Sequence, residues 1–462
     1  MTNTTCADGL LIVDKPQGVT SFDAVAAVRA ALHTKKVGHA GTLDPMATGM
    51  LVIGFGRATR LLQYIVEHDK TYEATIRLGL ATTTDDAEGD IVAPDTASLC
   101  SRWRELSAEP TEGGHPDVSD DAARLRAIIE STIAERFTGD IEQIPNTFSA
   151  IKIDGQRAYD LARAGKDVAL KARPVHIAEF TVLATREGLA STSDPASPLQ
   201  SAPTSRSRNG GDSRQSDPTS RSRWRELSAE PTEGGSEGVS ESARFVPVID
   251  VDVRVSCSSG TYIRALARDL GEVLGVGGYL TRLRRTRVGR FALSDDRSGL
   301  AQTTVLPAVT DAGIGDDTPG TGETATEAAE TTPAAMQAIA AHIEPKTFTN
   351  RDGETVTRNR CVLDTPGEAR GDWLRARAVG MADAARGAMP VADITADEAR
   401  ELRFGRRINR ELEKGVHYAA IVPATRGGIG DAAGAVVPAD VAAIIERANR
   451  TQAKPAVVFP TA

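Results

Sequence analysis

The sequence predicts an α/β (α+β) fold with a mixed, largely antiparallel sheet and a small C-terminal β domain, and three patterns lead to this fold class. Short apolar runs that end at Pro or Gly indicate buried strands at residues 9–15 and 50–56. Apolar and polar side chains alternate over residues 71–79, which is typical of a half-buried strand. Residues 21–33 carry a helical apolar stripe, and Ser21 is the predicted N-cap of that helix.

The next elements follow from the same two periodicities. Helical spacing predicts a helix over residues 121–137, and residues 141–168 run from a loop through a strand to a second helix. Residues 245–257 alternate as a strand does. The segment 260–275 predicts a helix that Gly275 ends, because glycine readily adopts the left-handed conformation found just past a helix.

The chain is long enough for two domains joined by a tether. Its 462 residues exceed what one hydrophobic core usually serves. Six acidic residues and no basic residue lie between Asp311 and Glu330, which predicts an acidic flexible linker. We therefore expect a first domain over residues 1–309, a linker over 310–335 and a β domain over 336–462. In the last of these, a helix is expected within 393–408 and strands at 417–424 and 455–459.

A sequence of fourteen residues, SRWRELSAEPTEGG, occurs twice without a single difference, at Ser101–Gly114 and at Ser222–Gly235. A structural repeat would keep its apolar periodicity while its surface residues drifted. Identical copies in surroundings rich in Ser, Gly, Pro and Arg instead indicate a recent in-frame insertion. We expect both copies to be solvent loops within disordered inserts at about 95–120 and 188–244. A peptide that binds a partner is the alternative.

Charge is distributed unevenly along the chain. The formal net charge of −9 argues against a nucleic-acid partner, because Lys and Arg supply most of the affinity for phosphates. However, Thr281–Arg290 contains five arginines and no acidic residue. This run is either a basic patch that binds RNA or a solvated face of one element. Its candidate RNA contacts are Arg282, Arg284 and Arg285.

Neither a disulfide framework nor a metal site is indicated. The four cysteines lie far apart, with no CxxC pair and no histidine at metal-ligand spacing. The first residues do not form a charged segment followed by a long apolar stretch, and no run of about 18 apolar residues occurs. We expect a soluble, cytoplasmic monomer without a membrane partner.

The stretch Val37–Gly56 presents one carboxylate on a constrained loop. Asp44 precedes Pro45, which disfavours a helical backbone at Asp44. Gly41 and Gly49 flank it at positions that permit tight turns. Because Asp-Pro is also a common turn initiator, spacing alone leaves a catalytic and a purely structural role open.

The segment Gly54–Thr59, GFGRAT, superficially resembles a dinucleotide-binding loop. It lacks the third glycine of that motif, and no clear βαβ unit with a suitably placed ribose-binding acid follows it. An NAD enzyme, or any other enzyme with a nucleotide cofactor, is therefore not expected.

Six blocks follow one another along the sequence: GLLIVDKPQGVTSFDAV, KKVGHAGTLDPMATGML, ATRLLQYIVEHDKTYEATIRLG, TTTDDAEGDIV, FSAIKIDGQRAYDLAR and CSSGTYIRALARDLG. They resemble blocks that TruB pseudouridine synthases carry in the same order. The resemblance covers roughly residues 9–293 apart from the two inserts, and it continues more thinly in the last domain. It implies a pseudouridine synthase catalytic domain followed by a PUA-like RNA-binding domain, in an enzyme that isomerises uridine-55 in the TΨC stem-loop of tRNA.

The resemblance also implies catalytic roles by position. Asp44, in GTLDP, matches the carboxylate that acts at the ribose. Tyr72, in DKTY, matches the residue that packs against the target base and assists proton removal. Arg264, in GTYIR, matches the residue that holds the catalytic carboxylate.

Further positions are implied to bind or support the substrate. His39 is similar to the residue that fills the space left by the flipped uridine, Lys15 supports the site from the first strand, and Tyr262 lies beside the catalytic arginine. The chain departs from the family pattern in IPNTFSA, where Asn146 replaces a proline and Phe148 replaces a tyrosine. Phe148 keeps the ring but loses the hydroxyl and any hydrogen bond that it made.

The chemistry of pseudouridine formation suits these residue types. The C1′–N1 bond breaks, the base turns and C1′ joins C5, so neither a cofactor nor a metal is needed. A carboxylate either attacks C1′ or deprotonates the sugar so that the base leaves. A nearby arginine keeps Asp44 ionised. An aromatic platform such as Tyr72 offsets the cost of unstacking the nucleotide, since stacking contributes about 1 to 3 kcal/mol per base.

A second class of function remains open, that of an RNA-folding chaperone that binds tRNA without needing catalysis. In either case the loop RFGRRI of the last domain is expected to contact phosphates through Arg403, Arg406 and Arg407.

Overall fold

The computed structural model describes residues 7–92, 96–107, 120–149, 151–153, 156–158, 161, 170–200, 245–294, 302–305, 336–349, 353–426 and 436–461. The chain forms two compact units, Met1–His68 with Arg285–Ala462, and Asp69–Arg284. Within the described ranges, none of the helices has the length and apolar character that spanning a bilayer requires.

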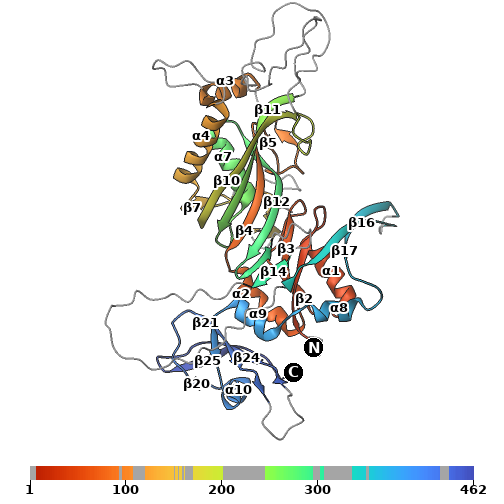
Figure 1. Cartoon of the computed structure of the whole chain (residues 1–462), viewed down its shortest axis with the longest axis vertical. Coiled ribbons are helices and arrows are strands. Elements are labelled where there is room, and N and C mark those ends of the chain that lie inside the picture. Colours follow the sequence, from red (N-terminus) through yellow and green to blue (C-terminus); the bar gives the residue numbers. More distant parts are fainter. Residues whose placement is uncertain are drawn as a thin grey trace, which may run out of the picture. The chain divides into compact units, whose positions relative to one another are not determined.

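Strand β1 (Gly9–Lys15) lies inside the sheet of the first unit, between two strands that Figure 1 labels, β3 (Thr48–Phe55) and β16 (Ile339–Thr349). It pairs antiparallel with β3 along its whole length. On its other side it pairs in parallel with β16, which pairs antiparallel with β17 (Thr355–Leu363). The two strands predicted first from the sequence, β1 and β3, are therefore confirmed, and the structure shows that they are neighbours in one sheet.

Helix α1 (Ser21–Leu32) follows β1 and packs against β17. The N-cap prediction was wrong by one residue, because Thr20 accepts from the backbone N–H of Asp23 and forms a capping box with it. Ser21 instead fixes a neighbouring loop, because its hydroxyl exchanges two hydrogen bonds with the backbone of Leu43, 2.8 and 3.1 Å long.

The first unit also contains a small sheet of five strands, in the order β19 (Val391–Asp393), β21 (His417–Val422), β24 (Asp440–Arg447), β25 (Gln452–Val458) and β20 (Ile408–Asn409). Its strands β21 and β25 fall where the sequence predicts them, at 417–424 and 455–459. Helix α10 (Ala396–Arg403), capped by Thr395, packs its buried side chains on this sheet. The C-terminal part of the chain therefore contains the small β-sheet that the sequence predicts there.

The predicted boundary at residue 336 does not coincide with a break in the structure. Strand β16 begins at Ile339 yet pairs with β1, and β18 (Val379–Gly380) pairs with the other end of β1. Sequence periodicity reveals strands but not their partners, which is why this pairing was not anticipated. The acidic linker at 310–335 lies outside the described residues.

The second unit is built on the antiparallel neighbours β4 (Lys70–Leu78), β11 (Phe245–Cys257), β10 (Arg173–Ser191) and β7 (Gly139–Gln143). Tyr72 in β4 lies opposite Val255 in β11. Strand β4 was expected to be half-buried, but almost all of its side chains are buried. A sheet covered on both sides removes the alternation on which that expectation rested.

Helices α3 (Thr96–Ser107), α4 (Asp120–Arg136) and α7 (Ile263–Leu274) belong to the second unit, and α4 packs on β10. Helix α4 falls where helical spacing predicts it. Helix α7 ends as predicted, at Gly275 with φ of 74°. Strand β12 (Gly278–Val288) begins beside β4, and the division between the units falls within it.

The first copy of the repeated sequence is not a solvent loop throughout, which corrects the prediction for residues 95–120. Its first half lies in α3, where Leu99 and Trp103 are only 4% and 2% exposed. Residues 188–200, at the start of the second predicted insert, are likewise ordered: they finish β10, and Leu189 bridges to Gln200. Residues 108–119 and the second copy lie outside the described residues.

The other elements are short. They are η1 (Gly56–Arg60), α2 (Leu62–Val66), α8 (Arg370–Ala376) and α9 (Met381–Ala388), and the strands β2 (Val37–Ala40), β5 (Ala81–Thr82), β6 (Ile91–Val92), β8 (Lys152–Ile153), β9 (Gln156–Arg157), β13 (Phe291–Ser294), β14 (Gln302–Val305), β15 (Met336–Gln337), β22 (Thr425–Arg426) and β23 (Val436–Val437).

Candidate active site

Lys15 anchors the Asp44 loop, residues 41–47, which joins β2 to β3 and carries Asp44. The side chain is fully buried at the end of β1, and its ammonium donates to the carbonyls of Pro16 (2.9 Å), Val19 (2.7 Å) and Pro45 (3.2 Å). Three acceptors offset the cost of burying this charge. The carbonyl of the residue that follows Asp44 is thereby fixed to the first strand.

Arg285 anchors the other side of the same loop. It is 1% exposed, and its guanidinium donates to Met50 O (2.9 Å), Gly41 O (3.1 Å) and Thr42 O (3.5 Å). Together with the Ser21–Leu43 hydrogen bonds, these contacts hold the backbone before Asp44. The half-buried carboxylate of Asp44 is thus carried by a backbone that two buried cations hold in place.

His39 lies in β2, half-buried, on the approach to this loop. Burial lowers the pKa of its imidazole, and the nearby Arg285 guanidinium lowers it further, against a hydrogen bond with Gly41 that raises it. The imidazole is therefore neutral at neutral pH. Its Nδ1 atom is enclosed and has no hydrogen-bond partner among the described residues.

The arginine run Thr281–Arg290 divides along β12. Because side chains alternate in a strand, Arg285 points to the buried side and Arg282 and Arg284 to the opposite side. Arg282 is exposed and lies 3.4 Å from the Thr75 hydroxyl, and Arg284 is half-buried. The buried position of Arg285 suits a residue that positions the Asp44 loop rather than one that contacts RNA directly.

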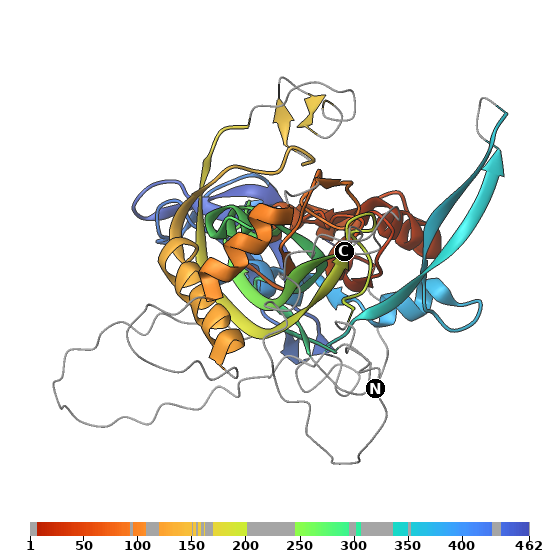
Figure 2. The same cartoon turned by 90° about the horizontal axis from the view of Figure 1, so that it is seen from above.

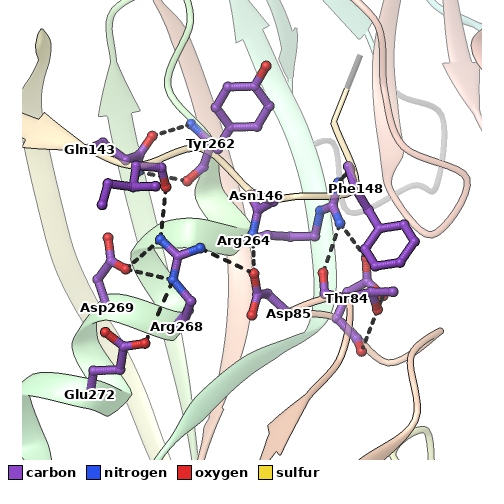
Figure 3. Close-up of polar contacts among 12 residues, drawn as sticks. Thr84, Asp85, Gln143, Asn146, Phe148, Tyr262, Arg264, Arg268, Asp269 and Glu272 are labelled. Atoms are coloured by element: carbon purple, nitrogen blue, oxygen red, sulfur yellow. Dashed lines mark hydrogen bonds and ion pairs between the residues drawn. The ribbon is translucent and has the colours of Figure 1, made fainter. Parts of the chain in front are cut away.

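In the second unit, Arg264 joins two segments at the start of α7 (Figure 3). It is 5% exposed, and it donates to the carbonyls of Thr84 and Phe148, each at 2.8 Å. It also forms an ion pair of 3.2 Å with Asp86, which is 4% exposed. The backbone carbonyl at position 148 therefore keeps a contact with this arginine although the side chain is Phe instead of Tyr.

Asp85 lies beside this ion pair in a left-handed backbone conformation with φ of 60°. The amide of Asn146, 1% exposed, donates to its carboxylate, and Arg268 lies 3.5 Å from the same oxygen. Burial raises the pKa of Asp85, while Asn146 and the two arginines lower it in part. The replacement of proline by Asn146 therefore supplies a hydrogen bond that proline cannot make.

Tyr262 is the N-cap residue of α7, and its backbone is fixed by Gln143. The Gln143 amide accepts from Tyr262 N at 2.9 Å and donates to Tyr262 O at 3.0 Å. Its phenol ring points away from the Arg264 cluster (Figure 3). Tyr72 is 8% exposed in β4.

The structure thus places the sequence-predicted residues in two groups. Lys15, His39 and Arg285 surround the Asp44 loop in the first unit, and Tyr72, Tyr262 and Arg264 belong to the second. Sequence reasoning assigned no role to Asp85 and Asp86, which pair with the α7 arginines. The signal was present, because both lie in TTTDDAEGDIV, one of the six blocks.

Comparison with known proteins decides the family. The model of the TruB family pseudouridylate synthase N-terminal domain matches residues 29–109 and 116–193, and that of the tRNA pseudouridylate synthase B C-terminal domain matches residues 264–309. A tRNA pseudouridine synthase B of Bifidobacterium longum strain DJO10A is 55% identical over 99% of both chains. The chain belongs to the TruB family.

A second TruB family relative, the tRNA pseudouridine synthase B of Arthrobacter sp. strain FB24, is 44% identical over 63% of this chain and 69% of its own length. A solved structure, that of an H/ACA RNP bound to a substrate RNA containing 2′-deoxyuridine, aligns with a TM-score of 0.45 and 17% identity, over 98% of this chain and 85% of that one.

Proposed function

We propose that this member of the TruB family is a tRNA pseudouridine synthase that isomerises uridine-55 in the TΨC loop, with Asp44 as its catalytic carboxylate. The observation that carries the proposal is the Asp44 loop, whose backbone is fixed on both sides by the buried cations Lys15 and Arg285. A carboxylate that must meet C1′ of an extruded nucleotide benefits from such a fixed backbone, since small displacements reduce rates strongly.

In the proposed reaction Asp44 either attacks C1′ or removes a proton from the sugar, and the C1′–N1 bond breaks. The base turns, C5 bonds to C1′, and the proton lost from C5 is balanced by the proton gained at N1. Product and substrate are isomers, so no external group enters. Asp44 is regenerated at the end.

Arg264 and Tyr72 complete the proposed site. Arg264, which contacts Asp86, Thr84 and Phe148 in the structure, is proposed from the family resemblance to hold the carboxylate of Asp44. An adjacent arginine favours the ionised carboxylate. Tyr72 is proposed to stack on the flipped base, and neutral His39 to occupy the space that the base leaves.

The substitution Asp44→Asn tests the proposal, because it keeps the size of the side chain and removes its charge. Pseudouridine formation, mapped by position on an unmodified tRNA transcript, is expected to fall by at least about 10²-fold. The Kd for tRNA, measured separately, is expected to stay within about threefold, since affinity comes mainly from phosphate contacts.

Two results would contradict this assignment. Retained activity of the variant would show that Asp44 is not the catalytic carboxylate. Loss of activity and affinity together, with a lowered melting temperature, would mean that Asp44 is structural. A wild-type chain that remodels tRNA but forms no pseudouridine would favour the alternative, an RNA-folding chaperone. Modification at another uridine would refute only the assignment of uridine-55 as the target nucleotide.

A further inference from the structure

Strands β16 and β17 form a two-stranded ribbon that projects from the first unit (Figure 2). The described part of the ribbon runs from Ile339 to Thr349 and from Thr355 to Leu363. Almost all side chains from His342 outward are exposed or half-buried. Both family matches end at residue 309 or before, so the ribbon is not part of either matched domain.

The ribbon starts beside the Asp44 loop. Its first strand pairs with β1, with Val13 opposite Ile339, and β1 ends at the anchoring Lys15. On the second strand, Asn359 donates to Gly18 O at 3.3 Å, and Gly18 N donates to Pro45 O at 2.8 Å. A chain of two hydrogen bonds therefore connects the ribbon to the residue next to Asp44.

Two cations face each other across the ribbon. Lys346 pairs directly with Arg358 in the strand register, and both are exposed. Like charges directly opposite each other destabilise a strand pair, so this arrangement costs stability in the free protein. Within the described residues neither cation forms an ion pair, whereas the neighbouring Glu344 is neutralised by Arg360 at 3.1 Å. An anionic ligand would relieve the repulsion.

The side chains around this pair suit a nucleic acid. Arg358 lies over the ring of the exposed Phe348, 5.6 Å from its centroid. The opposite side of the ribbon carries Thr347 and Thr357, whose hydroxyls lie 2.9 Å apart. Guanidinium, ammonium and hydroxyl groups are the usual donors to phosphate and sugar oxygens, and aromatic rings stack on bases.

We propose that the β16–β17 ribbon is an RNA-binding arm, in which Lys346 and Arg358 contact phosphates of the tRNA whose target nucleotide is held at Asp44. The proposal rests on the proposed function for the identity of the RNA. Because the arm leaves the protein next to the Asp44 loop, it meets the RNA backbone that flanks the target nucleotide. It binds and orients the RNA and takes no part in the chemical step.

The double substitution Lys346→Gln and Arg358→Gln tests this arm. The Kd and KM for a tRNA transcript are expected to rise about tenfold at low salt, with kcat unchanged. The slope of log Kd against log salt is expected to fall by about 0.7 to 0.9 for each phosphate that is no longer neutralised. The melting temperature should not fall, because removal of two facing like charges does not cost stability.

The double substitution Lys346→Arg and Arg358→Lys is the matched control, since it keeps both charges and is expected to bind tRNA like the wild type. An unchanged Kd and an unchanged salt slope in the Gln variant would contradict the proposal that the ribbon is an RNA-binding arm. So would weaker binding that comes with a lowered melting temperature and is not restored in the charge-preserving control. Failure of the wild type to form pseudouridine would refute the proposed function. The comparison of the Kd values for tRNA between the wild type and the Gln variant would still decide whether the ribbon binds RNA.

Discussion

At the residue scale, buried charged side chains hold the backbone of the site in place through hydrogen bonds to its carbonyl groups. Lys15 and Arg285 each donate to three backbone carbonyls, among them those of Pro45 and Gly41 on either side of Asp44, and Arg264 donates to two carbonyls in the second unit. The sequence places Lys15 and Arg264 in recognisable blocks. Arg285 lies outside them, in the run Thr281–Arg290, where the sequence does not distinguish it from Arg282, which has the same chemistry and points to the other side of β12. Only the strand register separates a positioning arginine from one available to RNA.

Asn146 provides a residue-scale prediction with a definite pH dependence. Its amide donates to Asp85, whose pKa is raised by burial and partly lowered again by this hydrogen bond. A raised pKa means that stability is lost as the pH rises from the unfolded-state value of about 3.9 through the folded-state value. The substitution Asn146→Ala removes the donor to the charged form and raises the folded-state pKa further. We expect a loss of about 1 to 3 kcal/mol at pH 7 that shrinks towards pH 4.

Urea unfolding of the wild type and of Asn146→Ala at several pH values measures this difference. The variant Asn146→Asp adds a second carboxylate beside Asp85 and is expected to be less stable than Asn146→Ala at pH 7. A penalty that does not vary with pH would show that Asn146 acts through packing and not through the Asp85 carboxylate.

At the scale of elements, the two copies of SRWRELSAEPTEGG offer an internal comparison. Trp103 in the first copy is 2% exposed in α3, although the sequence around it predicts a loop. The substitution Trp103→Ala is expected to cost about 3 to 5 kcal/mol, the usual range for removing a buried tryptophan. The matched variant Trp224→Ala changes the same residue of the second copy, which the sequence predicts to be a solvent loop, and is expected to cost less than about 0.5 kcal/mol. Equal melting temperatures of the two variants would contradict this.

A comparison of α3 with the other elements shows why some elements could be predicted from the sequence and others could not. Strands β1 and β3 and helices α4 and α7 have a periodicity or an end signal within their own residues, as Gly275 shows for α7. Helix α3 contacts α4, and its Leu99 and Trp103 are buried, which local composition does not reveal. The pairing of β16 with β1 depends on strand partners, about which periodicity says nothing.

At the scale of the whole molecule, a chain with net charge −9 would have to bind the proposed tRNA substrate through local concentrations of positive charge. The β16–β17 ribbon carries one such concentration, and the C-terminal sheet carries a second, beside α10. Phe404 is 70% exposed with Arg406 stacked 5.5 Å from its ring centroid. Arg406 also forms an exposed ion pair of 3.1 Å with Glu401, and Arg407 is exposed. Arg403, also predicted to contact phosphates, is paired with Asp440 and donates to Phe459 O at 3.1 Å. It therefore suits a role within this sheet better than one on RNA.

Deletion of residues from Met336 onward would remove β16 and β18, which pair with β1, so point substitutions are the appropriate test of the C-terminal sheet. The variant Arg406→Ala with Arg407→Ala is expected to raise KM for tRNA severalfold and to flatten its salt dependence without changing kcat, because these side chains are proposed to contact phosphates away from the reacting nucleotide. The control Arg400→Ala removes an exposed charge from α10, which ends just before the loop that carries Arg406 and Arg407; Arg400 is paired with Asp397. An unchanged KM in the double variant would restrict RNA binding to the remainder of the chain. Combined with the Lys346 and Arg358 substitutions, the effects on binding free energy should add if the two surfaces contact the RNA independently.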